Sequence, residues 1–251
     1  MFTQLTLDIA LKDSFTFDNF VAGDNQLLVD LLKNENNSEK QVYIWGAHNT
    51  GKTHLLQALC QFHSTAYSNN NIKLSYLPIK QLIDFSPEIF QGQEAMDICC
   101  IDDVQLLQNK SLWQEALFDL INRIRESGKR LVVSANQPPT EINIELKDLI
   151  SRLQWGPVFK LNELSDNEKC QAMQQRAQCR GFDLEDNVAT YLLNNCNRDI
   201  ADLYCVLDAL EQAQLQQHRR LTIPFVKLVL EDLKKYYSIL KRVQPVSDFI
   251  Y

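Results

Sequence analysis

The sequence has no excess of positive charge. Its 251 residues include 25 lysines and arginines against 32 aspartates and glutamates, which gives a formal charge of −7 at pH 7. Proteins that bind DNA tightly through their own surface normally carry a basic excess, because contacts to phosphate supply much of the affinity. The composition therefore favours protein partners over direct sequence-specific DNA binding, with a local basic groove hidden in this average as the alternative.

The sequence also lacks paired cysteines, metal-binding histidine patterns and long apolar runs. Its seven cysteines form no CxxC pair and lie mostly in apolar stretches, which predicts reduced, buried thiols in the cytoplasm. The four histidines do not have the spacing of metal ligands. Asp8, Lys12 and Asp13 interrupt the N-terminal segment, and no apolar run is long enough to span a membrane. We therefore expect a cytoplasmic protein without a leader peptide or a membrane partner.

Short apolar segments predict strands, and helical patterns separate them. Helical periodicity covers residues 53–62 and the segment between Trp113 and Ile124. Strands that alternate with helices predict an α/β fold, in which crossovers cover both faces of a mostly parallel, five-stranded sheet. The strand candidates are residues 42–45, 73–77, 98–101, 131–135 and 158–161.

After residue 161 the pattern becomes wholly helical. Ser165 and Glu168 form a capping box at the start of one helix, and further helices are predicted over residues 186–195 and 199–217. A fourth helix is expected to start behind Pro224. The chain is thus expected to comprise an N-terminal peptide, an α/β core, a small all-helical lid and a C-terminal tail, at residues 1–14, 15–163, 164–235 and 236–251.

A phosphate-binding motif follows the first strand candidate. Residues 46–53 read G-A-H-N-T-G-K-T and fit the P-loop pattern G-x-x-x-x-G-K-[ST]. In such a loop the glycines let the backbone curl around phosphates, Lys52 reaches the β- and γ-phosphates and Thr53 binds Mg²⁺. The residues expected to contact a nucleotide in and beside this motif are Gly46, Asn49, Thr50, Gly51, Lys52, Thr53 and His54.

Polar residues follow two of the other strand candidates. A carboxylate at the end of the strand beside a P-loop holds Mg²⁺ and the next acid can polarise the attacking water, so we assign Asp102 to Mg²⁺ and Asp103 to the water. An acidic pair after a strand can also cap a helix. Asn136 would face the γ-phosphate if its strand lies between the other two, which makes it a candidate sensor, although an asparagine before Gln-Pro-Pro can also be a turn residue.

These motifs, followed by a helical lid, resemble the AAA+ family and, more narrowly, the nucleotide-binding region of the DnaA family of bacterial replication initiators. Residues 15–23, F-T-F-D-N-F-V-A-G, are similar to the initiators' T-F-D-N-F-V-x-G segment, and residues 150–156, I-S-R-L-Q-W-G, are similar to their arginine-finger box. The resemblance covers about residues 15–233. It implies ADP or ATP with Mg²⁺ as cofactors, and it places Phe20 and Val21 near the adenine.

Two arginines gain roles from this resemblance. Arg152 lies in the arginine-finger box and is implied to project into a neighbouring subunit's site, where it neutralises charge on the transferred phosphoryl group. Arg198 resembles the family's second sensor in its position at the start of a lid helix. In the family that arginine reaches from the lid helix to the nucleotide's phosphates. Such AAA+ interfaces also allow a homo-oligomer. The alternative for any single exposed arginine is a solvated surface charge.

The expected organisation resembles that of a regulatory branch of this family. Members of this branch have no DNA-binding domain. The initiators carry a C-terminal helix-turn-helix domain, for which the tail is expected to be too short. Residues 4–9, Q-L-T-L-D-I, are similar to peptides that dock on the sliding clamp, the β subunit of DNA polymerase III. In such a peptide Gln4 bonds at a pocket rim while Leu5, Leu7 and Ile9 fill apolar slots. A frayed edge strand is the alternative for this segment.

The resemblance implies a negative regulator of replication initiation in the bacterial cytoplasm, associated with the nucleoid or replisome. Bound to nucleotide, with ADP in the working state, it would dock on the DNA-loaded clamp and offer Arg152 to ATP held by DnaA. Two alternatives stay open. The chain could hydrolyse its own ATP, since Lys52, Thr53, Asp102 and Asp103 are all present. It could also be a DnaC-type helicase loader, although loaders carry an N-terminal helicase-binding domain.

Overall fold

The computed structural model describes residues 15–34, 39–66, 72–217 and 219–232. The chain divides into two compact units, Met1–Glu163 and Leu164–Tyr251, which we call the core unit and the lid unit. Among the described residues, no helix has both the length and the apolar character that a membrane crossing requires.

A parallel sheet of five strands forms the centre of the core unit. Its spatial order is β2-β3-β4-β1-β5, and every neighbouring pair is parallel. The expected α/β class is confirmed, and each predicted strand lies within one residue of its observed ends. The strands are β1 (Gln41–Trp45), β2 (Leu74–Pro78), β3 (Ile98–Asp102), β4 (Arg130–Ala135) and β5 (Val158–Lys160).

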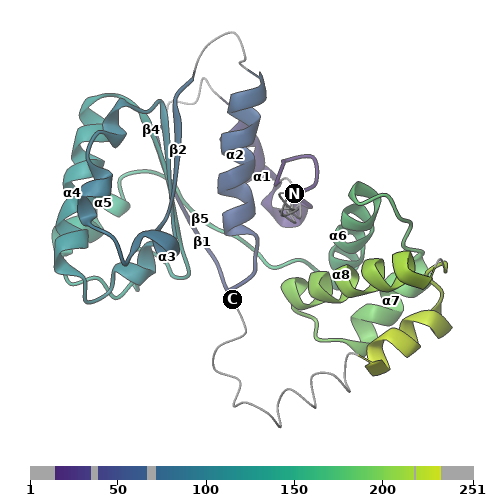
Figure 1. The fold of residues 1–251 in the computed structure, drawn as a ribbon. Helices are drawn as coiled ribbons and strands as arrows, with labels where there is room; N and C mark the ends of the chain where they lie inside the picture. Colours follow the sequence, from purple (N-terminus) through teal and green to yellow (C-terminus); the bar gives the residue numbers. More distant parts are fainter. Residues whose placement is uncertain (1–14, 35–38, 67–71, 218, 233–251) are drawn as a thin grey trace, which may run out of the picture. The chain divides into compact units, whose positions relative to one another are not determined.

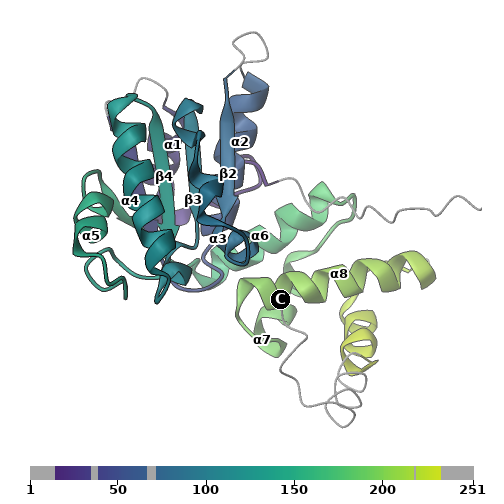
Figure 2. The same cartoon turned by 60° about the vertical axis from the view of Figure 1, so that its left-hand side comes forward.

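Helices cover both faces of this sheet (Figure 1). On one face lie α1 (Gln26–Lys33) and α2 (Lys52–Ala66), and on the other lie α4 (Ser111–Glu126) and α5 (Lys147–Leu153). Figure 2 brings β2, β3 and β4 to the front in their order in the sheet. The shorter helical elements of the core unit are η1 (Gly23–Asn25), α3 (Ile79–Leu82), η2 (Pro87–Phe90), η3 (Gln93–Ala95) and η4 (Val104–Leu107).

The strands are apolar throughout because both faces of the sheet are buried. In β1, Val42 and Ile44 pack against α1 and α2, whereas Tyr43 between them packs against α4. In β3, Cys100 faces the first layer and Cys99 faces the second. Side chains that alternate between two covered faces produce the continuous apolar runs that predicted these strands.

The lid unit is helical and has its own apolar core. It contains α6 (Asp166–Cys179), α7 (Asp186–Asn195) and α8 (Ile200–Gln217), and residues 223–232 are also helical. The predicted capping box is present, because the Glu168 carboxylate accepts from the Ser165 N–H at 2.7 Å. Asp199 precedes α8 and accepts the Ala201 N–H at 2.8 Å, so it caps this helix instead of lying within it.

The expectation that the cysteines are buried is wrong for most of them. All seven are free thiols, and only Cys99 and Cys100 are buried. Cys205 shows the physical reason. It lies in an apolar run of α8, but Leu203 and Leu207, four residues apart, form the buried stripe and leave Cys205 exposed on another face.

Candidate functional site

The P-loop connects β1 to α2, and its two glycines occupy positions where a side chain would collide. A Cβ at Gly46 would lie 2.8 Å from the carbonyl oxygen of Leu161. Gly51 has a φ of +97°, and a Cβ there would lie 2.9 Å from the ring of Phe20. Glycine is therefore required at both ends of the loop, as the motif predicts.

The other residues of the loop fix its turn and place a positive charge inside it. Asn49 has a φ of 60°, which asparagine tolerates better than most residues, and the Thr50 hydroxyl donates to the Ala47 carbonyl at 3.0 Å. The Lys52 ammonium group donates to the carbonyls of Gly46 at 2.9 Å and Ala47 at 2.7 Å. Lys52 is thus tied to the curve of the loop that precedes it.

Lys52 is only 7% exposed. Burial lowers the pKa of its ammonium group from the ordinary value of 10.5, and the charges of Asp103 and Asp102 oppose that shift. A positive charge in a poorly hydrated loop has a strong preference for anionic groups. This residue has the chemistry of a phosphate ligand.

Asp102, at the end of β3, is the centre of a buried network of hydrogen bonds. Its carboxylate accepts from the hydroxyls of Thr53 at 2.7 Å, Tyr76 at 2.8 Å and Ser134. The residue is 2% exposed, so these three donors replace the water that a carboxylate would otherwise bind. We call Asp102, Thr53, Tyr76 and Ser134 the Asp102 network.

The two residues predicted to hold Mg²⁺ fit that ion. Thr53 and Asp102 come from different elements, α2 and β3, and the structure brings their oxygens within 2.7 Å of each other. Both supply hard oxygen ligands, and Mg²⁺ commonly uses one or two protein ligands together with water and phosphate oxygens. When bound, the ion would supply charge neutralisation at the phosphates.

Asp103 and Asn136 are linked by a residue that the motifs do not name. The Gln105 side chain donates to the Asp103 carboxylate at 2.8 Å, and its carbonyl oxygen accepts the Asn136 backbone N–H at 3.2 Å. Asp103 has a φ of 64°, and its N–H donates to the Ser134 hydroxyl at 3.0 Å. β4 lies between β3 and β1, which is the condition under which Asn136 would face a γ-phosphate.

The aromatic N-terminal segment packs against the first turn of α2. The ring nitrogen Nε2 of His54 lies 2.8 Å from the Thr16 carbonyl oxygen. The His54 ring lies 4.9 Å from Phe15 and 5.1 Å from Phe20, measured between ring centres. Val21 is half-buried in the same segment. The residues assigned to the adenine side therefore adjoin the P-loop, and their contact with adenine stays a prediction.

Arg152 lies in the last turn of α5, where it is held by side chains of its own chain. Its Nε–H donates to the Asn122 side-chain oxygen at 2.9 Å, and its guanidinium carbon lies 3.9 Å from the centre of the Trp155 ring. The Arg125 guanidinium carbon lies 3.7 Å from the same centre. The Trp155 ring is therefore in contact with two cations. We call Asn122, Arg125, Arg152 and Trp155 the arginine corner.

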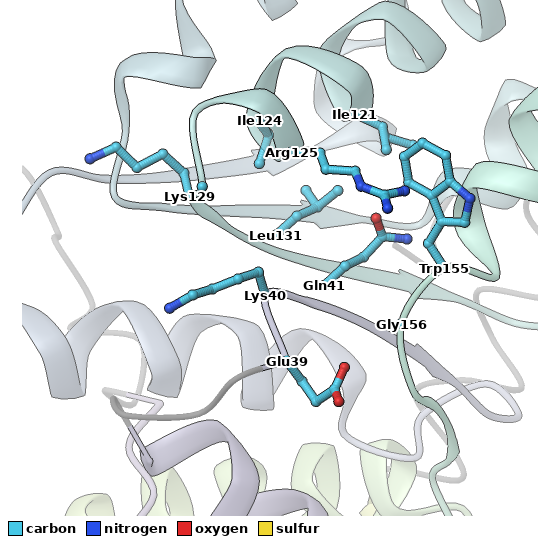
Figure 3. A pocket seen from close by; sticks show the side chains of 11 residues that line it. Glu39, Lys40, Gln41, Ile121, Ile124, Arg125, Lys129, Leu131, Trp155 and Gly156 are labelled. Carbon is cyan, nitrogen blue, oxygen red and sulfur yellow. The ribbon is translucent and has the colours of Figure 1, made fainter.

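A cavity of about 230 Å³ adjoins this corner at the starts of β1 and β4 (Figure 3). Figure 3 shows the Arg125 guanidinium against the Trp155 ring, with the Gln41 side chain close by. Gln41 donates from its side-chain amide to the Arg152 carbonyl oxygen at 2.6 Å. The backbone of Arg152 is therefore fixed to the sheet, while its guanidinium group is held by aromatic contact and one hydrogen bond.

Arg198 belongs to the lid unit. It forms an ion pair with Asp166 at 3.0 Å, and both side chains are more than half exposed. Its contact with nucleotide phosphates stays a prediction. The proposed clamp-binding residues, Gln4, Leu5, Leu7 and Ile9, lie outside the described residues, as does the C-terminal tail.

Two known protein families match this chain, one in each unit. A sequence profile of the bacterial DnaA ATPase domain matches residues 11–160, more than half of the chain. The chain belongs to this family. A second profile, for the Hda lid domain, matches residues 166–230. The protein is therefore an Hda- and DnaA-related AAA+ protein, and the predicted family resemblance is confirmed.

Solved structures agree on the fold. Domain III of the replication initiation protein DnaA from Thermotoga maritima is 21% identical, with a TM-score of 0.76 over 88% of this chain and 97% of that chain. AMPPCP-bound DnaA from Aquifex aeolicus is 19% identical, with a TM-score of 0.66 over 96% and 75%. The Thermotoga maritima RuvB Holliday junction branch migration motor is 15% identical, with a TM-score of 0.63 over 85% and 68%.

Sequence reasoning missed the residues that support the predicted ones. Ser134 carries a hydroxyl group within a strand that is buried at every position, and a buried hydroxyl requires a hydrogen-bond partner. A serine inside an otherwise apolar strand was therefore a signal that the sequence offered. Tyr76 is another residue with a hydroxyl group inside a strand, β2. Gln105, Asn122 and Arg125 gave none, because their roles arise from contacts across the fold.

Proposed function

We propose that this chain binds an adenine nucleotide at the P-loop and promotes hydrolysis of ATP held by the initiator DnaA, and so restrains replication initiation. The observation that carries this proposal is the succession of two family matches in one chain, a DnaA ATPase domain followed by an Hda lid domain. The first supplies the nucleotide site, and the second favours the regulatory branch over the initiators.

The geometry of the core unit supports nucleotide binding. A buried Lys52, a loop with glycine at both points of close approach and a Thr53–Asp102 pair are the parts that hold phosphates and Mg²⁺ in P-loop proteins. The AMPPCP-bound relatives of the same fold agree with ATP or ADP as the ligand. ADP is the proposed occupant in the working state.

Arg152 is the proposed group that acts on DnaA. It would leave its stacked position beside Trp155 and stabilise charge on the phosphoryl group of ATP bound to DnaA. The N-terminal peptide with Gln4 would dock the protein on the sliding clamp, which brings DnaA and this chain together at replicating DNA. The chain would then be mainly a partner that completes another protein's active site.

The test follows radiolabelled ATP pre-bound to DnaA, with clamp loaded on DNA, in the presence and absence of this protein. We expect faster conversion to ADP that depends on the clamp and is lost with either Arg152→Ala or Gln4→Ala. An unchanged rate with the wild-type protein would contradict the proposal. Binding to the replicative helicase and not to the clamp would favour the helicase-loader alternative.

A second candidate function, hydrolysis of its own ATP, is favoured by the arrangement around Gln105. That side chain contacts both the Asp103 carboxylate and the Asn136 backbone, as expected for a site that aligns an acid and a sensor. Turnover by the purified protein without clamp or DnaA, and its loss in Asp103→Ala, would support this function. Absence of such turnover would exclude it.

A further inference from the structure

Two cysteine thiols meet beneath the P-loop, and the proposed function uses neither of them. The Sγ atoms of Cys60 and Cys100 lie 3.7 Å apart. Cys60 lies in α2 and is half-buried, whereas Cys100 lies in β3 and is fully buried. The sulfurs are in contact, and of the two residues only Cys60 is partly exposed.

The positions of these thiols follow from the periods of the two elements. Thr53 and Cys60 are seven residues apart on α2, which places them on one face of the helix, two turns apart. Cys100 and Asp102 are two residues apart on β3, and therefore point to the same face of the sheet. Hence α2 and β3 meet at two points, Thr53 with Asp102 at 2.7 Å and Cys60 with Cys100 at 3.7 Å.

We propose that Cys60 and Cys100 form a peroxide-oxidisable site whose disulfide cross-links α2 to β3. The thiol of the half-buried Cys60 reacts with hydrogen peroxide to give a sulfenic acid and water. The Cys100 sulfur then attacks the Cys60 sulfur, and a second water molecule leaves as the disulfide forms. In total, two thiols and one peroxide become one disulfide and two waters.

The chemistry of Cys60 favours it as the first reactant. Its hydrogen bond with Cys100 lowers the pKa of the Cys60 thiol, which increases the fraction present as reactive thiolate. Cys99, the neighbour of Cys100, points to the other face of the sheet and packs with the α4 layer. Cys99 is therefore the matched control, since it is on the same strand but faces away from Cys60.

The disulfide would act on the nucleotide site, and this consequence rests on the proposed function. A disulfide requires sulfurs about 2.05 Å apart, so the pair must close by roughly 1.6 Å from its 3.7 Å separation. We expect that movement to draw α2 toward β3 and to disturb the Thr53–Asp102 pair. Displaced supporting contacts typically lower metal affinity about tenfold or more, and we expect a similar loss for Mg²⁺–nucleotide.

The test of the site itself uses the full chain treated with hydrogen peroxide, alkylated and mapped by peptide mass spectrometry. We expect a linked peptide pair containing Cys60 and Cys100 that dithiothreitol removes, that is absent in Cys60→Ser and that persists in Cys99→Ser. Cys60 is half-buried, so its serine variant is expected to fold. Alkylation of both thiols after oxidation, or a Cys99–Cys100 link instead, would overturn the proposal.

The regulatory consequence has a separate readout. Oxidised wild-type protein is expected to bind Mg²⁺–ADP about tenfold more weakly than reduced protein, while oxidised Cys60→Ser keeps the affinity of its reduced form. A disulfide without any change in affinity would overturn the consequence but not the site. Failure of the reduced protein to bind ADP would instead contradict the proposed function, because the mapping does not depend on nucleotide.

Discussion

The Asp102 network and the arginine corner both hold charged groups in the core unit, but they hold them differently. Asp102 is 2% exposed, and hydroxyls from three separate elements surround it. Arg152 is half-buried at the end of α5, where one side-chain hydrogen bond and the rings of Trp155 and Phe118 hold its guanidinium group.

The difference suggests what each region can do. A buried carboxylate with all its partners fixed is preorganised, and moving it would cost the full penalty of an unpaired buried charge. A half-buried arginine that leaves gives up one hydrogen bond and its aromatic contacts, about 2 to 3 kcal/mol in total, and its charge returns to water. The first arrangement suits a site that keeps its own ligand, and the second suits a group that moves to a partner.

The largest expected effect comes from removing the buried charge of the P-loop. Lys52→Ala should weaken ADP binding roughly 10²-fold, since the phosphates would lose their charged partner inside a poorly hydrated loop. Lys129→Ala is the matched control, because that lysine pairs with Asp97 at the surface. Calorimetric titration with Mg²⁺–ADP measures both, and equal affinities for the two variants would contradict the assignment.

The affinity for ADP should change with pH because the same lysine, Lys52, loses its proton at high pH. Burial lowers the pKa of Lys52, so in the free protein its charge is complete below that lowered value and is lost as pH rises through it. Nucleotide phosphates favour the charged form, and affinity should therefore fall by up to about tenfold per pH unit above the free-protein pKa.

Titrations from neutral pH up to the ordinary lysine value of 10.5 measure this decline, with Lys52→Arg as the control. A guanidinium group keeps its proton throughout that range, so the variant's residual affinity should not fall. A decline of equal steepness in both proteins would assign the titration to another group.

The sequence predicted the strands and the P-loop well because both follow local rules. Apolar runs locate β1 and β3, and the motif locates Lys52 and Thr53. It did not predict that Tyr76, from β2, would reach Asp102, since that contact depends on which strands become neighbours. Nor could it show that Arg152 and Arg125 contact the same Trp155 ring, because helix packing decides which side chains share a ring.

Two tyrosines of the same sheet donate hydrogen bonds to acceptors of different charge. Tyr76 donates to the Asp102 carboxylate, and Tyr43 donates to the Gln137 carbonyl at 3.0 Å. Burial raises the pKa of both phenols, so both remain donors. Tyr76→Phe should lower the free energy of unfolding by about 2 kcal/mol and Tyr43→Phe by about 1 kcal/mol. Urea denaturation measures both, and the reverse order would contradict the importance of the Asp102 network.

The smallest expected effect is the coupling within the arginine corner. A double-mutant cycle between Arg125→Ala and Trp155→Leu should give a coupling free energy of about 1 kcal/mol, and the cycle with Arg152→Ala should give a similar value. Urea denaturation of the single and double variants supplies these energies. A coupling above about 3 kcal/mol for Arg152 would mean that the finger is fixed too firmly to move to a partner.

The most direct test of the central claim compares the two arginines that share Trp155. Single-turnover hydrolysis of DnaA-bound ATP would be measured with loaded clamp and saturating amounts of wild-type protein, Arg152→Ala or Arg125→Ala. We expect Arg152→Ala to reduce the rate to that of DnaA alone, while Arg125→Ala retains most of the stimulation. Stimulation by Arg152→Ala equal to that of the wild-type protein would contradict the claim that this residue acts on DnaA.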